Sequence, residues 1–221
     1  MSRENPNLLV LIDMNGTLLL REKKCLPGRA PDFIHAKKYY YMRPGAKDFV
    51  KEIIAMPGIR FAFYTSMLET NAKPAISNLA GRGWEKDGVQ LYARDYQKHD
   101  PNGKNKWDTM RDLDKIWKEE MTNHGYKFGP HNTVMIDDTP EKMREHPHNV
   151  LIVPEMTAAS LVREDGDSSV LDNVQKYIKQ MLLVLSSKPS SVPDYISKLP
   201  FDTLSDIEDL SRVLSSATLT E

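Results

Sequence analysis

Three apolar segments of the chain end in residues that can do chemistry. Asp13 follows the run LLVLI, Thr65 follows IRFAFY, and Asp137 and Asp138 follow TVMI. Continuous apolar runs of this length are typical of strands buried on both faces of a parallel sheet. The ligand site of such a sheet lies outside the carboxyl ends of its strands, so we expect these four residues to converge on one crevice.

The residue types suit phosphoryl transfer. A carboxylate such as Asp13 can attack phosphorus and form an aspartyl-phosphate, which divides a difficult hydrolysis into two steps. Because this nucleophile and a phosphate are both anionic, a hard cation such as Mg²⁺ must lie between them, and Asp137 and Asp138 can supply further oxygen ligands. The Thr65 hydroxyl can hold a phosphate oxygen, while a Lys or Arg offsets charge.

Strands and helices alternate around these segments. The run from Ile59 to Tyr64 follows a helical pattern, and strand, helix, strand is a parallel crossover unit. We therefore predict an α/β fold, a Rossmann-like three-layer parallel sheet. The predicted helices are 46–56, 71–79, 108–123 with Asp108 as N-cap, and 170–185. Further predicted strands are 39–42, 90–93 and 150–153. Residues 20–36 form a loop or a small insertion, and 99–106 form a loop.

The carboxyl-terminal part differs in composition from the rest. We predict one domain over residues 1–186, followed by a linker and short helix over 187–221. The segment SSKPSSV is linker-like, and Ser205 to Glu208 forms a capping-box pattern before the short helix.

Composition excludes several classes of protein. Thirty basic residues against 31 acidic ones give a formal charge of -1, with no basic excess to indicate direct nucleic-acid binding or a membrane surface. No apolar stretch reaches the 18 or so residues of a membrane span. A single cysteine, Cys25, excludes a disulfide framework. With too few residues before the first strand for a signal peptide, we expect a cytoplasmic or nuclear protein.

Four motifs occur in a characteristic order: Asp13-Met14-Asn15-Gly16-Thr17-Leu18, Arg43-Pro44-Gly45 before a helix, Tyr64-Thr65-Ser66, and Asp137-Asp138-Thr139-Pro140. Together they resemble the haloacid dehalogenase superfamily. Within it they look most like the carboxy-terminal-domain phosphatases of RNA polymerase II and their relatives. The similarity covers roughly residues 8–154. It implies a Mg²⁺-dependent phosphatase fold without a large cap domain.

The resemblance also implies roles for individual residues. Asp13 is similar to the phosphorylated nucleophile and metal ligand, and Asn15 occupies the position whose carbonyl binds the metal and whose side chain acts as general acid and base. Asp137 and Asp138 resemble the metal-side pair. Thr65 resembles the phosphate-binding hydroxyl, and we further predict that Thr17, Ser66 and Arg43 bind substrate.

The family also uses a Lys near the start of the helix that precedes the last motif. Matching without gaps puts Arg111 at this position, whereas Lys106 lies just ahead of the helix if Asp108 caps it. Either cation can neutralise phosphate, and we favour Lys106 slightly.

Asn15 departs from the family pattern, which has an aspartate there. A neutral amide can neither protonate a leaving group nor activate water, and losing such help typically costs about 10²–10⁴-fold in rate. Two functions follow. One is a phosphatase, impaired by Asn15, that acts on phosphoserine or phosphothreonine in proteins. A protein substrate is expected because the spacing of the motifs leaves little material for a lid over the site. The other is a pseudophosphatase that binds a protein partner.

Overall fold

The main body of the protein is a five-stranded parallel sheet. The computed structural model describes residues 6–105, 108–162 and 168–201. The strand order is β10-β9-β1-β5-β6, and each neighbouring pair is parallel. The strands are β1 (Leu8–Ile12), β5 (Ile59–Tyr64), β6 (Gln90–Tyr92), β9 (Thr133–Asp137) and β10 (Val150–Ile152). The predicted α/β fold with a parallel sheet is therefore confirmed.

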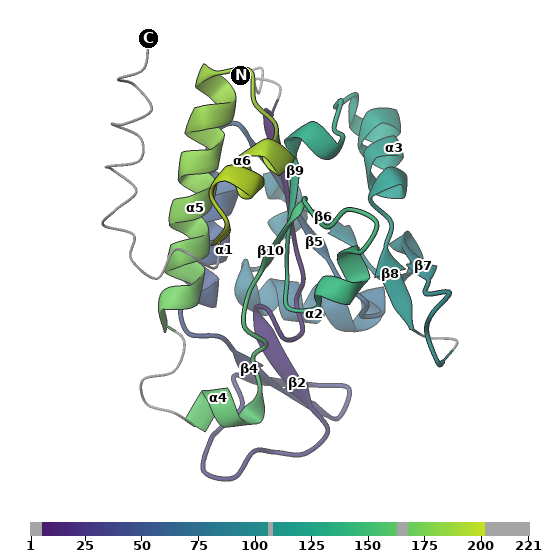
Figure 1. Ribbon diagram of the computed structural model, residues 1–221. Helices are drawn as coiled ribbons and strands as arrows, with labels where there is room; N and C mark the ends of the chain where they lie inside the picture. The colour runs from purple at the N-terminus through teal and green to yellow at the C-terminus, as the bar shows by residue number, and fades with distance from the viewer. Residues whose placement is uncertain (1–5, 106–107, 163–167, 202–221) are drawn as a thin grey trace.

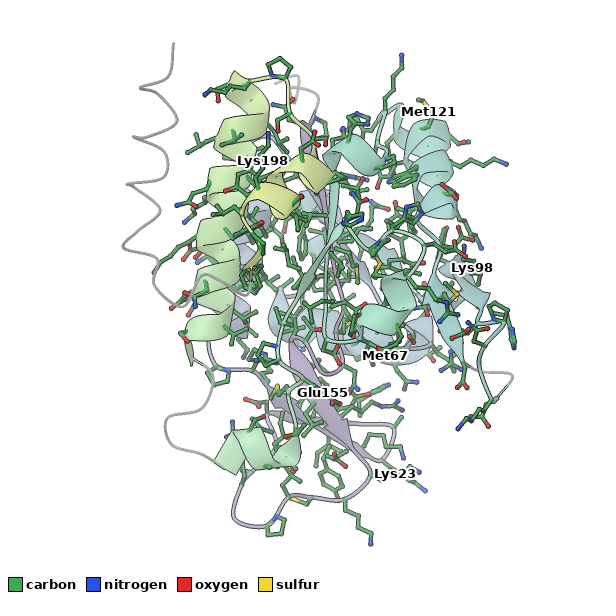
Figure 2. All side chains as sticks on the ribbon, viewed as in Figure 1. Lys23, Met67, Lys98, Met121, Glu155 and Lys198 are labelled. Atoms are coloured by element: carbon green, nitrogen blue, oxygen red, sulfur yellow. The ribbon has the colours of Figure 1, made fainter. Side chains whose placement is uncertain are left out.

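Helices cover both faces of the sheet (Figure 1). Side chains alternate along a strand, and in β1 Leu8, Val10 and Ile12 face one core while Leu9 and Leu11 face the other. The first core packs α1 (Ala46–Ala55), α2 (Glu69–Leu79), α5 (Ser168–Ser187) and α6 (Val192–Lys198). The second core packs α3 (Leu113–His124). Figure 2 shows the side chains that fill these two layers.

A small antiparallel sheet is inserted between β1 and α1. It contains β2 (Leu19–Glu22), β4 (Lys38–Met42) and β3 (Phe33–His35) in the order β2-β4-β3. The strand at 39–42 and a small insertion over 20–36 were both predicted and are confirmed; the alternative of a loop over all of 20–36 is wrong, because β2 and β3 occupy its two ends. The sequence pattern of β2 and β3 is a weak strand signal, because both are short and carry polar residues on half-exposed faces. Both strands pair with β4, which lies between them.

The helix predicted to begin at Asp108 begins five residues later. Thr109–Arg111 forms strand β8, which pairs with β7 (Gln97–His99) in an antiparallel hairpin. Asp112 is the N-cap of α3, and its carboxylate accepts a hydrogen bond from the Lys115 N–H at 3.1 Å. The cross-strand pairing takes Thr109 to Arg111 out of the helix, which local helical spacing cannot reveal.

The other predicted elements are confirmed to within a few residues, and short elements join them. These are η1 (Trp84–Asp87), η2 (Arg94–Tyr96), η3 (Pro130–Asn132), η4 (Pro140–Met143) and α4 (Ala158–Val162). Helix α6 was not predicted; its Val192 and Tyr195 are buried in the core with α5. The short helix predicted after Ser205 lies outside the described residues. Within the described ranges, no helix has the length and apolar character needed to cross a membrane.

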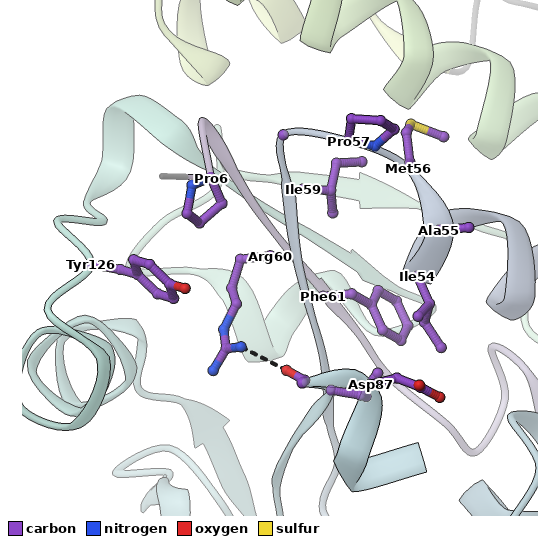
Figure 3. Close-up of a pocket in the computed structure, with 13 residues that line it drawn as sticks. Pro6, Ile54, Ala55, Met56, Pro57, Ile59, Arg60, Phe61, Asp87 and Tyr126 are labelled. Carbon is purple, nitrogen blue, oxygen red and sulfur yellow. Dashed lines mark hydrogen bonds between the residues drawn. The ribbon is translucent and has the colours of Figure 1, made fainter. Parts of the chain in front are cut away.

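A buried charge network lies at the amino-terminal edge of the sheet. Arg60 of β5 donates through Nε to both carboxylate oxygens of Glu120 at 3.1 Å, and the Tyr92 hydroxyl donates to Glu120 at 2.5 Å. Arg60 also donates to the carbonyl of Gly88 and lines a cavity of about 440 Å³ (Figure 3). This cavity is at the opposite edge of the sheet from Asp13 and Thr65, so the network is structural.

We expect Glu120→Ala to lower the free energy of unfolding by about 3–5 kcal/mol, because it leaves the Arg60 charge buried without its carboxylate. Urea denaturation measures this loss. Glu69→Ala is the control, since it removes an exposed carboxylate whose ion pair with Lys73 lies in solvent and contributes little. Equal losses in the two variants would contradict the assignment.

Candidate functional site

The ends of three adjacent strands bring the predicted acids together. β1 lies between β9 and β5, so Asp13, which follows β1, is flanked by the end of β9 at Asp137 and by Thr65 after β5. One carboxylate oxygen from each of Asp13, Asp137 and Asp138 lies within 4.8 Å of the other two. This confirms the predicted convergence of the three acids. A cluster of three carboxylates fits a hard divalent cation, which prefers oxygen ligands.

Arg111 joins two of these acids. Its Nη2 lies 2.7 Å from Oδ1 of Asp13 and 2.7 Å from Oδ2 of Asp137, and its Nε donates to the same Asp137 oxygen at 2.8 Å. The side chain of Arg111 is fully buried. Because it sits at the end of β8, the hairpin delivers this cation to the tips of β1 and β9.

Burial and charge shape the protonation of this pair. Burial raises the pKa of Asp13 to about 6, although the Arg111 guanidinium opposes this rise. Burial also lowers the pKa of Arg111, but the carboxylates of Asp137 and Asp13 outweigh it and raise that pKa above its ordinary value. Arg111 therefore stays charged, and its charge favours the ionised form of Asp13.

The two neighbouring acids of the last motif have different environments. Asp137 is buried and uses both oxygens, one toward Arg111 and the other to accept the Thr139 N–H at 3.0 Å. Asp138 is half-buried and accepts hydrogen bonds from the hydroxyls of Thr17 at 2.9 Å and Thr139 at 3.3 Å. Asp137 thus holds Arg111, whereas Asp138 is held by hydroxyl groups.

Two residues predicted to bind substrate support the loop after β1. Thr17 is fully buried and its hydroxyl faces Asp138. Arg43 is also buried, and its guanidinium donates to the carbonyls of Gly16, Thr17 and Pro154 at 2.6 to 3.0 Å. Hydrogen bonds within the protein fix the two side chains on the loop, and substrate binding by Thr17 and Arg43 stays a prediction.

A pocket of about 230 Å³ opens beside Asp13. The predicted residues Asn15, Thr65 and Ser66 line it, and Thr65 is buried with its hydroxyl oxygen accepting the Met67 N–H at 3.3 Å. Ser66 donates to Gln97 at 3.1 Å. Sequence reasoning missed four further lining residues: Arg21, Met67, Arg94 and Lys142. Met67 directly follows the motif Tyr64-Thr65-Ser66, and Lys142 lies two residues after Pro140, so the motifs could have indicated these two.

Asn15 is exposed at the mouth of this pocket. Its Oδ1 accepts the main-chain N–H of Arg21 at 2.9 Å, which assigns Nδ2 to the other side of the amide. An aspartate at this position could keep the same hydrogen bond through one carboxylate oxygen and present the other. The local backbone is therefore compatible with either residue.

The preference for Lys106 as the site cation rested on a helix that begins at Asp108. That helix start is wrong, and Arg111 occupies the centre of the acid cluster. Lys106 lies outside the described residues.

Gly16 makes room for Asp138. Its φ of +93° is in the left-handed region, and a Cβ there would lie 2.5 Å from Oδ2 of Asp138. We expect Gly16→Ala to displace this carboxylate and to weaken Mg²⁺ binding about 10- to 100-fold, the usual effect of disturbing the support of a metal ligand. Titration calorimetry with Mg²⁺ measures the affinity.

Gly81→Ala is the matched control, because Gly81 has a φ of +90° and no atom within 4 Å of the added Cβ. It imposes the same backbone strain without touching an acid. Both variants should lose thermal stability, and only Gly16→Ala should lose affinity for the cation. Unchanged Mg²⁺ binding in Gly16→Ala would count against Asp138 as a ligand.

Comparison with known proteins agrees with this site. The family model for NLI interacting factor-like phosphatase matches residues 8–188. An uncharacterised FCP1 homology domain-containing protein of Schizosaccharomyces pombe is 29% identical over 213 residues, which cover 93% of this chain and 83% of the relative. The structure of Fcp1, an essential RNA polymerase II CTD phosphatase, superposes with a TM-score of 0.55 at 14% identity, covering 85% of this chain and 68% of that one.

The Fcp1 similarity shows a shared fold. The family model spans most of the chain and includes the segments that carry Asp13, Thr65, Arg111 and Asp138. The chain belongs to the NLI interacting factor-like phosphatase family.

Proposed function

We propose that the chain is a Mg²⁺-dependent phosphatase that removes phosphate from phosphoserine or phosphothreonine in proteins, with turnover slowed by Asn15. The observation that carries this proposal is the meeting of Asp13, Arg111 and the Asp138 carboxylate beside a pocket lined by Thr65. A nucleophile, a buried cation, a metal-binding acid and a hydroxyl donor are the groups that phosphoryl transfer needs.

In this proposal Asp13 is the nucleophile. One of its oxygens attacks phosphorus, the bond from phosphorus to the serine or threonine oxygen breaks, and an aspartyl-phosphate forms on Asp13. The departing oxygen takes its proton from solvent, because Asn15 has none to give. Water then attacks the phosphorus, the bond from phosphorus to Asp13 breaks, and the Asp13 carboxylate and inorganic phosphate are released. Arg111 holds Asp13 in one orientation and supports its ionised form, because the two groups are 2.7 Å apart and buried.

The donor set fits Mg²⁺. Asp13, Asp138 and the main-chain carbonyl of Asn15 would hold the ion, and Asp137 completes the acidic cluster while it anchors Arg111. When bound, Mg²⁺ offsets the negative charge of the phosphoryl group against that of the carboxylates. Thr65 and Ser66 would bind phosphoryl oxygens, since both line the pocket next to Asp13.

The pocket suits a phosphorylated residue in a protein segment. The inserted β2-β4-β3 sheet is small, so the described chain has no large cap over the pocket. Enzymes of small phosphorylated metabolites usually close over their substrate to exclude water. A relative in fold, Fcp1, is named as a phosphatase of an RNA polymerase II segment, which supports a protein substrate here.

A second candidate function is a pseudophosphatase that binds a phosphoprotein or another partner without turnover. Asn15 favours it, because Nδ2 can donate a hydrogen bond to a phosphate or leaving oxygen but cannot deliver a proton. Under this alternative the acid cluster and the pocket serve for binding alone.

Hydrolysis of an aryl phosphate with Mg²⁺ distinguishes the two functions. We expect slow turnover by the chain as given and a gain of about 10²–10⁴-fold in Asn15→Asp, because the carboxyl group restores proton transfer. Asn78→Asp adds the same charge on the exposed face of α2 and is expected to leave the rate unchanged. If Asn15→Asp is as inactive as the parent, the binding function is the correct one.

Tyr64 positions Arg111 in this account. The centre of its ring lies 4.9 Å from the Cζ of the Arg111 guanidinium. Its hydroxyl accepts a hydrogen bond from the main-chain N–H of Asp112, the residue after Arg111, at 2.7 Å and donates one to the carbonyl of Tyr96 at 2.9 Å. Burial raises the pKa of the Tyr64 hydroxyl, so it stays protonated. One side chain therefore contacts both the main chain and the charged group of the site cation.

We expect Tyr64→Phe, in the Asn15→Asp background, to lower kcat/KM at least about tenfold, because small displacements of positioned groups cost this much or more. Steady-state kinetics with the aryl phosphate measures the effect. Tyr92→Phe is the control, since it also removes a buried hydroxyl hydrogen bond but lies on Glu120, away from Arg111.

Loss of stability without a kinetic effect in Tyr92→Phe would show that the kinetic loss in Tyr64→Phe comes from Arg111. Equal kinetic losses in the two variants would assign Tyr64 a structural role only.

A further inference from the structure

Three cations line the pocket beside Asp13. Arg21 comes from β2, Arg94 from η2 and Lys142 from η4, so three separate segments of the chain contribute one positive charge each. The pocket contains one carboxylate, Asp13, and Arg111 already pairs with it from behind. The open side of the site is therefore strongly positive.

Within the part of the chain that the structure describes, none of these three side chains forms an ion pair with a carboxylate at 4.0 Å or less. The Nε of Arg94 donates to the carbonyl of Ser66 at 2.9 Å, which is a neutral acceptor. Arg60 and Arg144, in contrast, each lie on a carboxylate. Arg94 is exposed, whereas Arg21 and Lys142 are half-buried. A half-buried cation without an ion pair is costly, because it loses part of its hydration with nothing to replace it. Their grouping in one pocket indicates an anionic ligand.

One phosphate group does not account for all three charges. A phosphorylated side chain carries about 1.5 to 2 negative charges near pH 7. Lys142 lines the pocket together with Asp13, and the Nε of Arg94 donates to the carbonyl of Ser66, the residue after Thr65. These two cations suffice for the phosphoryl group that Asp13 receives. Arg21 is left over.

Arg21 stands apart from the other two. It lies on the inserted sheet, where it pairs in register with Tyr40 of β4, and its main-chain N–H is bonded to Asn15 at the mouth of the pocket. Its side chain is half-buried rather than extended into solvent. A group held by Arg21 would therefore lie beside the phosphorylated residue, toward the β2-β4-β3 sheet.

We propose that the preferred substrate carries a second anionic group next to the phosphorylated residue, and that Arg21 binds it. The inference rests on the proposed phosphatase function and names its substrate class. An acidic side chain or a second phosphate would supply the same chemistry. Arg21 determines specificity here and takes no part in the bond-breaking step.

The test uses Asp13→Asn, a variant that cannot turn over phosphopeptides. Fluorescence anisotropy in the presence of Mg²⁺ measures its affinity for labelled phosphoserine peptides. Four peptides are compared: neutral neighbours, an aspartate neighbour, a second phosphoserine, and the aspartate peptide without phosphate. We expect the aspartate and doubly phosphorylated peptides to bind about five- to tenfold more tightly than the neutral one, as for one charge-assisted contact.

The peptide series also separates the two sources of the anion, since the aspartate and phosphoserine arms report on each alone. The advantage should fall as salt rises, because charge interactions near the surface are screened. The aspartate peptide without phosphate should bind weakly, since it lacks the group that Thr65, Arg94 and Lys142 hold.

Variants of Arg21 assign the effect. In Arg21→Gln the peptide with an anionic neighbour should bind no more tightly than the neutral phosphopeptide. The affinity for the neutral phosphopeptide should stay within about twofold of that of the Arg21 protein, since loss of a charge-assisted hydrogen bond would cost more. Arg21→Lys should keep part of the advantage because it keeps the charge. Arg82→Gln removes an exposed charge after α2 and should change neither value.

Two outcomes have distinct meanings. If all phosphopeptides bind equally, or if Arg21→Gln keeps the advantage, the inference about the second anion is wrong and the phosphatase proposal stands. If no phosphopeptide binds and Asn15→Asp hydrolyses no phosphate ester, the proposed function itself fails, and the inference fails with it.

Discussion

The buried ion pairs of Arg111 are the interaction on which the rest of the site depends. Asp13 and Asp137 come from adjacent strand ends and would repel each other in a region that excludes water. A guanidinium at 2.7 Å from both removes that repulsion and fixes the two carboxylates relative to each other. Removing one member of such a cluster leaves a buried charge without compensation, which is strongly unfavourable. Asp13, Asp137 and Arg111 therefore depend on one another for their stability in the buried site.

Several parts of the fold position Arg111. The β7-β8 hairpin carries it, the N-cap of α3 follows it directly, and Tyr64 contacts both its charged group and the following main-chain N–H. Tyr64 also precedes Thr65 at the end of β5. The same short segment thus places the cation and the hydroxyl that lines the pocket, so the two cannot move independently.

The loop after β1 is also held by several contacts, and these fix its conformation without involving the side chain of residue 15. Arg43 binds its carbonyls, Thr17 orients Asp138, and Gly16 leaves space for that carboxylate. These contacts do not depend on the chemical identity of residue 15. In the proposed function Asp13, Thr65 and Asp138 supply groups for phosphoryl transfer, and Asn15 has an amide in place of the proton donor.

Much of this was predictable from the sequence, because the buried parallel strands read as apolar runs and their ends must meet at one edge of the sheet. The errors came from non-local pairing. Strands β2 and β8 are short, half-polar segments that form because another strand pairs with them, so the start of α3 was misplaced. The preference for Lys106 over Arg111 depended on that misplaced start. The pocket cations Arg21 and Arg94 belong to no motif used in the prediction.

The central claim is that Asp13 accepts a phosphoryl group and that Asn15 slows its release. The most direct measurement is the intact mass of the chain as given after exposure to an aryl phosphate and Mg²⁺, with peptide mapping of any adduct. The account predicts one added phosphoryl group, on Asp13, that persists in this chain and is short-lived in Asn15→Asp. An adduct on another residue, or none in a protein whose Asn15→Asp form turns over, would contradict it.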